Sequence, residues 1–206
     1  MRSKVFVRAL AFGAAASLAL TAAASAQTMP TASHDFHAAP AGKYAIDPKH
    51  TGLIARVPHV GFSYSIFRFQ GVTGAMVWDP AKPASDTLSV SVDAKSIATA
   101  PVDGFSAEID DRFLKATNFP VATFTSTRFH PTSATHGTVE GDLVLMGVTK
   151  HVVFDVDLVG AGVGMGHHPV LGVTARTTLD PKAYGLPGFI TGPIELVIDT
   201  EFDGQS

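Results

Sequence analysis

Alternation of apolar and polar residues with a period of two is the feature that most restricts the fold of this chain. Near residue 90, Leu88, Val90 and Val92 alternate with two serines and an aspartate. The same spacing recurs in residues 152–158 and 194–199. Successive side chains of a β-strand point to opposite faces, so this pattern predicts half-buried strands. The sequence therefore predicts an all-β fold.

Further strands are expected where similar short apolar runs are separated by glycine and proline. Asp79-Pro80, Gly147 and Asp180-Pro181 are typical turn signals between such runs. The additional candidate strands are residues 44–47, 52–57, 67–78, 121–129, 137–145 and 171–179. So many short strands with turns between them indicate either a β-sandwich or a β-barrel.

One segment, residues 105–116, has the spacing of a short helix. Phe105, Ile109, Phe113 and Ala116 follow one another at intervals of four, four and three residues. This places the four side chains on one apolar stripe. Periodicity does not separate a sandwich from a barrel, but a barrel of about eight strands has room inside for one small ligand. The 14 phenylalanines could line such an interior or simply fill a core.

The start of the chain has the order of a secretory signal peptide. Arg2, Lys4 and Arg8 precede an apolar stretch over residues 9–24, and Ala24-Ser25-Ala26 forms a small-residue cleavage site. A transmembrane anchor is the alternative, but a membrane span needs about 20 strongly apolar residues and this run is short and alanine-rich. We therefore expect residues 1–26 to be removed after Ala26 and the protein to reach the periplasm.

Charge and cysteine content exclude several functions for the remaining chain. Removal of residues 1–26 leaves 180 residues, with 12 basic against 18 acidic side chains and a net charge of −6. A chain with this charge has no basic field to hold nucleic acid. The absence of cysteine excludes thiol redox chemistry and thiolate metal sites. Residues 27–42 lack periodicity and are expected to be a flexible lead, before one domain over residues 43–203.

Four motifs resemble those of the YceI-like family, the polyisoprenoid-binding periplasmic proteins. The segment GTVEGDLVLMGVTKHVV at residues 137–153 is similar to the family signature, and the other motifs fall in family order at residues 44–63, 119–127 and 175–186. The chain departs from the family pattern in residues 101–107 and in the Ser65-Ile66-Phe67 run, both of which belong to the expected rim.

The resemblance implies an eight-stranded antiparallel lipocalin-like barrel with an elongated apolar cavity and one short helix near residues 105–116. It also implies that the protein binds a long-chain isoprenoid, such as a prenyl phosphate or a quinone, or a related amphiphilic lipid, and sequesters or carries it in the periplasm. No cofactor, metal ion or catalytic residue is implied.

Candidate binding residues follow from the strand faces and the matched motifs. A histidine or arginine at the mouth could donate hydrogen bonds to a phosphate or carbonyl head group. The candidates for the mouth are His59, Arg56 and Arg112. Apolar residues on one face of their strands could line the cavity or fill a plain core, and these are Leu53, Val57, Phe69, Phe124, Leu143, Phe154 and Leu196.

Two other functions stay open at this point. A barrel enzyme acting on a lipophilic substrate would need a titratable pair deep in the tunnel, and the pattern shows none on the apolar faces. A stress-response protein would have a filled core instead of a cavity. The expected partner is the lipid itself, with no nucleic acid and no transmembrane anchor after processing. A homodimer and a membrane-protein partner for loading are left open.

Overall fold

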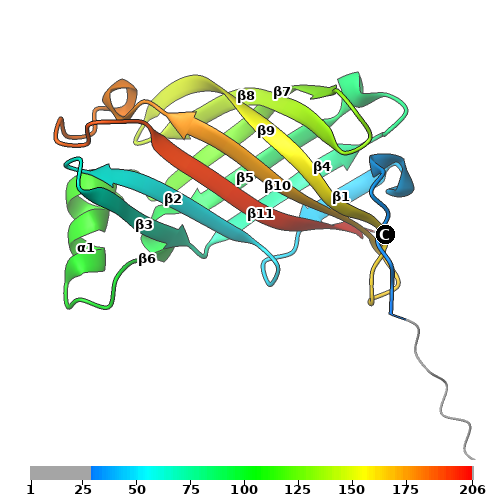
Figure 1. Cartoon of the computed structure of the whole chain (residues 1–206), viewed down its shortest axis with the longest axis horizontal. Helices are drawn as coiled ribbons and strands as arrows, with labels where there is room; N and C mark the ends of the chain where they lie inside the picture. The colour runs from blue at the N-terminus through cyan, green and yellow to red at the C-terminus, as the bar shows by residue number, and fades with distance from the viewer. Residues whose placement is uncertain (1–28, 206) are drawn as a thin grey trace, which may run out of the picture.

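The structure, a computed structural model, describes residues 29–205 and is built on a closed antiparallel β-barrel (Figure 1). Eight strands form the ring, and each is paired with its neighbours on both sides. This confirms the predicted barrel and excludes the sandwich. In ring order the strands are β1 (Gly42–Ile46), β4 (Val72–Trp78), β5 (Thr87–Asp93), β7 (Val121–Pro131), β8 (His136–Leu145), β9 (Val148–Val163), β10 (Pro169–Leu179) and β11 (Ile194–Gln205).

The long strand β11 has two different partners on one of its edges. Its C-terminal part, from Phe202, pairs with β1 and closes the barrel, whereas Glu195–Asp199 pairs with β2. Strands β2 (Gly52–His59) and β3 (Ser63–Phe69) form a hairpin, and the short β6 (Ile97–Ala98) adds to the edge of β3. The barrel wall is therefore extended by a hairpin at one end.

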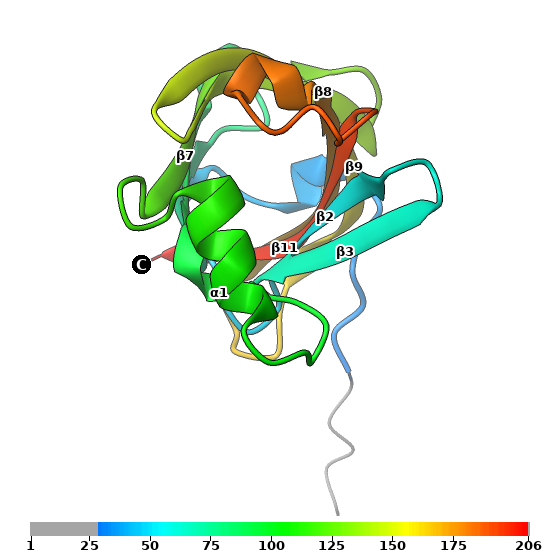
Figure 2. The ribbon, with the colours of Figure 1, turned by 90° about the vertical axis from the view of Figure 1, so that its left-hand side faces the viewer.

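A short helix lies across this end of the barrel (Figure 2). Helix α1 covers Phe105–Ile109 and continues as a π-helical turn over Asp110–Leu114. Phe105 and Ile109 pack against the core, and Ala116 is fully buried. The apolar stripe read from residues 105–116 is thus the face that meets the barrel.

Part of the N-terminal segment, for which a flexible lead over residues 27–42 is expected, makes specific contacts with the barrel. Ser33 exchanges two backbone hydrogen bonds with Ala161, of 2.8 and 2.9 Å. A single 3-10 turn, η1 (Phe36–Ala38), follows, and Trp78 donates its indole N–H to the carbonyl of the buried Ala39. Periodicity missed this segment because it is held by isolated contacts and not by a repeating face. The signal peptide predicted for residues 1–26 lies outside the described residues.

The single strand expected over residues 67–78 is two strands. β3 ends at Phe69 and β4 begins at Val72. Both strands run in the same direction as β11, so the chain does not reverse at Gln70-Gly71 but exchanges its strand partners, from β2 and β6 to β1 and β5. A side chain on Gly71 would lie 2.9 Å from Asp93 Cβ and 3.0 Å from Ser96 Cβ, so this link packs closely on η3 (Ala94–Ser96) and the end of β5. One glycine between two apolar runs was too weak a signal to show the break.

Asp86, before β5, gives a prediction about stability and pH. Asp86 is 7% exposed, and among the described residues its carboxyl accepts one hydrogen bond, from the backbone N–H of Asp79 at 2.6 Å. Burial, with a contribution from the Asp79 charge, raises the pKa of Asp86 to about 6, although that hydrogen bond opposes the shift. The folded state therefore takes up a proton at higher pH than the unfolded state, and the Asp86 contribution to stability improves as pH falls from about 6 to about 4.

Replacement of Asp86 by Asn removes this titration. As the pH is lowered from 7 to 4, the free energy of unfolding of the wild type should rise by roughly 2–3 kcal/mol relative to that of the variant, since one pKa unit corresponds to about 1.4 kcal/mol. Urea unfolding of both proteins at several pH values measures the difference. A stability difference that stays constant across this pH range would contradict the assignment.

Among residues 29–205, the longest apolar helical segment is too short to cross a bilayer.

Candidate ligand-binding cavity

The barrel encloses two adjoining apolar cavities along its axis. The first has a volume of about 190 Å³ and the second, toward α1, a volume of about 420 Å³. The larger volume falls in the range of small-molecule sites, roughly 300–1,000 Å³. The cavities meet at side chains that belong to both walls, namely Leu53, Val92, Ala122, Leu143 and Leu196. The two cavities therefore lie next to each other along the barrel, with these five side chains at their junction.

The alternation seen in the sequence builds this wall directly. On β5 the inward side chains are Leu88, Val90 and Val92, and all three line the first cavity. On β11, Leu196 and Ile198 do the same, whereas Glu195 is on the outer face and pairs with Arg56. One face of each strand therefore supplies an apolar lining without directional polar contacts.

Aromatic side chains shape the first cavity. Phe124 and Phe154 meet edge to face, with 5.2 Å between ring centroids. Phe36 of η1 and Trp78 of β4 pack in the same manner at 5.8 Å. Edge-to-face contacts hold rings in fixed orientations, so these four residues give the cavity a defined shape.

The second cavity ends at α1, the β2–β3 hairpin and the loop that follows η5 (Pro181–Tyr184). Phe113 and Phe189 meet edge to face here, at 5.8 Å, across the space between the π-helical turn and this loop. Arg112 forms an ion pair with Glu108 and lies 5.6 Å from the centre of the Phe113 ring. Charged side chains therefore lie at this end of the second cavity, which we call the mouth, and the apolar lining begins further inside the barrel.

The structure places the predicted residues as follows. All seven side chains predicted to line a cavity lie on the walls, which are built from Leu53, Val57, Phe69, Phe124, Leu143, Phe154 and Leu196 with their neighbours. His59 and Arg112 lie at the mouth. Arg56 is not on either wall: its neighbours Ala55 and Val57 point inward, so Arg56 points outward, where it pairs with Glu195. Contact with a ligand stays a prediction for all of them.

Two wall residues were missed because they lie outside the strands. Phe36 lies in the segment read as a flexible lead, and Phe189 lies in an irregular loop between η5 and β11. Neither belongs to a repeating pattern, so no periodic signal marks them as wall residues. Val156 and Ile198, by contrast, follow the alternation of their strands and could have been added. Phe129 faces the cavity five residues after Phe124 because of the irregularity of β7 between Ser126 and Arg128, so alternation alone would have placed it outside.

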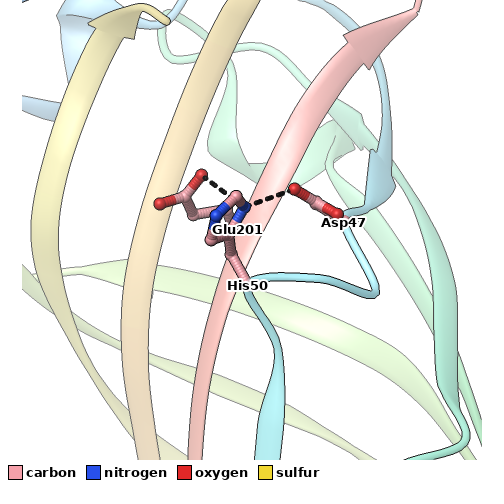
Figure 3. A group of neighbouring side chains, drawn as sticks. All are labelled: Asp47, His50 and Glu201. Carbon is pink, nitrogen blue, oxygen red and sulfur yellow. Dashed lines mark hydrogen bonds and ion pairs between the residues drawn. The ribbon is translucent and has the colours of Figure 1, made fainter. Parts of the chain in front are cut away.

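Outside the barrel, His50 lies between two carboxylates (Figure 3). Its Nδ1 is 2.6 Å from Asp47 Oδ2 and 3.7 Å from Glu201 Oε2. The hydrogen bond to Asp47, aided by the Glu201 charge, raises the pKa of His50, and the Lys49 N–H together with His50 lowers the pKa of Asp47. These contacts fasten the β1–β2 turn to β11.

The same three side chains are also spaced for a metal ion, with their ligand atoms within 4.8 Å of one another. The direct His50–Asp47 hydrogen bond accounts for this spacing without an ion, because it holds the two side chains together itself.

The barrel and its apolar interior define a lipocalin-like class of protein, and comparison with known proteins identifies the family. A YceI-like domain matches residues 44–202. A UPF0312 protein of Vibrio cholerae serotype O1 is 33% identical over 156 residues, which cover 72% of this chain and 80% of the relative. The chain belongs to the YceI family.

Solved structures share the fold at low sequence identity. The crystal structure of Burkholderia cenocepacia BcnA matches with a TM-score of 0.65 and 17% identity, over 78% of this chain and 99% of BcnA. A polyisoprenoid binding domain from Saccharophagus degradans, implicated in plant cell wall breakdown, matches with a TM-score of 0.60 and 14% identity, over 79% and 98% of the two chains. These matches confirm the closed barrel.

Proposed function

We propose that this protein binds one long-chain isoprenoid lipid, such as a prenyl phosphate or a quinone, inside the barrel and sequesters or carries it in the periplasm. The observation that supports this most is the pair of adjoining apolar cavities along the barrel. A structure with the same fold is described as a polyisoprenoid binding domain, which agrees with this ligand class.

The driving force is removal of apolar surface from water, worth about 25 cal/mol for each Å² buried. Such a force depends on area and not on chemical detail, so discrimination between isoprenoid chains should be loose. Chain length should be limited by the depth of the cavity. The head group is then left at the mouth, near His59 and Arg112.

The proposed role is binding and not catalysis. In the described part of the chain, the titratable side chains on the walls are those of His59, Glu108 and Arg112 at the mouth and of His130 and His136 near the β7–β8 turn. They lie near the two ends, with apolar residues between them. A bound chain would therefore meet an unreactive surface along most of its length.

Mass spectrometry of the protein purified from its native host tests the proposal. Extraction with organic solvent should release a long-chain isoprenoid in about equimolar amount, and the emptied protein should take up an added prenyl alcohol or quinone. If neither a bound lipid nor uptake is found with folded protein, the proposal is wrong.

A further inference from the structure

Four large apolar side chains of the β2–β3 hairpin lie in water. Val60, Phe62, Tyr64 and Ile66 are exposed by 49, 91, 49 and 60%. We call these four residues the hairpin patch. Scattered exposed apolar residues are common, but four within seven residues of one hairpin form a patch of the kind that marks an interaction surface.

The turn of this hairpin holds valine in a backbone conformation that is unfavourable for it. Phe62 donates its N–H to the carbonyl of His59, and the two residues between them, Val60 and Gly61, have φ values of 50° and 80°. Two-residue turns with positive φ at both positions favour Asn-Gly, since a β-branched side chain is unfavourable there. Val60 thus costs stability, and its apolar side chain at the tip is not explained by folding.

Two arginines and no acidic residue lie on the hairpin that carries the patch. Arg56 and Arg68 lie on the hairpin, whose residues 52–69 include no aspartate or glutamate. Arg56 is directly opposite Ile66, so both project from the same outer face. Its guanidinium lies 4.5 Å from the centre of the Tyr64 ring, although it also pairs with Glu195 from β11. Arginine and tyrosine beside exposed phenylalanine and isoleucine suit the boundary between lipid phosphates and acyl chains.

The hairpin patch lies next to the mouth of the cavity. Pro58 and His59, which lead into the turn, are on the wall of the second cavity. Seen along the barrel from this end, the hairpin borders the opening on one side and α1 crosses it (Figure 2). Phe189, which is 47% exposed, also lines this cavity. The hairpin that carries the patch therefore borders the mouth, and Phe189 adds a further exposed apolar side chain there.

We propose that the hairpin patch docks on the surface of an anionic phospholipid bilayer, with Phe62 and Val60 inserted among the acyl chains. The mouth then faces the membrane, and an isoprenoid passes between bilayer and barrel without crossing water. The transfer of an isoprenoid rests on the proposed function, but docking on the bilayer can be measured separately.

Sedimentation with vesicles tests docking of the chain from which residues 1–26 have been removed. The vesicles contain phosphatidylethanolamine and phosphatidylglycerol. A Phe62→Ser/Ile66→Ser double variant should bind them at least about tenfold more weakly than the wild type, because it loses two large apolar side chains. The matched control is Val159→Ser/Val163→Ser, which removes two valines of 57 and 60% exposure on β9 and should bind like the wild type.

Uptake of water-dispersed farnesol separates docking from ligand binding. All three proteins should take up farnesol equally, whereas only the hairpin variant should extract a quinone slowly from vesicles. If no protein takes up farnesol but vesicle binding still depends on the hairpin, docking stands and the lipid-carrier function fails. Equal vesicle binding by both double variants, or no binding by the wild type, overturns docking. Docking is also overturned if the patch instead holds two copies of the chain together. In that case the wild type and the control variant would form a dimer, the hairpin variant would be a monomer, and none of the three would bind vesicles.

Discussion

Leu143→Asp is expected to abolish uptake of long isoprenoids while the barrel stays folded. Leu143 is 9% exposed and lies on the walls of both cavities, where a bound chain must pass. An alkyl chain placed against an unpaired carboxylate displaces the water that solvates the charge, at a cost of several kcal/mol. We therefore expect affinity for a long-chain quinone to fall by at least about 100-fold, as measured by titration and native mass spectrometry.

Two further variants make this prediction specific. Val153 is 46% exposed and is not part of either wall, so Val153→Asp should bind the quinone like the wild type. Leu143→Trp adds bulk instead of charge at the junction, so it should retain short farnesol and reject the long quinone. Retention of the long quinone by both Leu143 variants would remove Leu143 from the binding surface.

Gly141→Ala should destabilise the barrel strongly, by about 3 kcal/mol, since overpacking of a tight site typically costs 1–3 kcal/mol and occasionally more. A Cβ atom at this position would collide with the backbone carbonyl oxygen of Thr125 and would lie 2.5 Å from Phe124 Cζ. The Phe124 ring lies over this glycine, next to an irregularity of β7 between Ser126 and Arg128. The backbone oxygen leaves little room to adjust, so the strands must move apart.

Gly172→Ala is the matched control for this variant. Gly172 also lies within a paired barrel strand, but a Cβ there would meet its nearest neighbour, the Gly160 carbonyl oxygen, at an ordinary 3.6 Å. Urea unfolding should show a large loss of stability for Gly141→Ala and a small change for Gly172→Ala. Equal losses of stability in the two variants would show that the close contact of Gly141 with Thr125 and Phe124 does not determine the effect of the alanine substitution.

The strands that build the site could be predicted because inward and outward residues alternate along them. Leu196 and Glu195 show how one residue step separates the cavity wall from the outer surface. The same rule, applied from Ala55 and Val57, assigns Arg56 to the outside, so its placement at the mouth was avoidable. The closure of the barrel and the ligand class came from resemblance, because sandwiches and barrels share the same alternation.

What the sequence did not show depends on contacts between distant segments. Phe36 reaches the cavity because Ser33 pairs with Ala161, more than a hundred residues further along the chain. The change of partner along β11, from β2 to β1, likewise depends on the whole barrel and not on any local pattern. The mouth is built from α1, a hairpin and an irregular loop, and such assemblies leave no periodic signature.

The crystal structure of the protein loaded with a long-chain quinone tests the central claim most directly. The account predicts continuous density for one isoprenoid chain through both cavities, passing Leu143 and Leu196, with the ring at the mouth near His59 and Arg112. A quinone bound on the outer surface, with side chains or water filling the interior of the barrel, would contradict it.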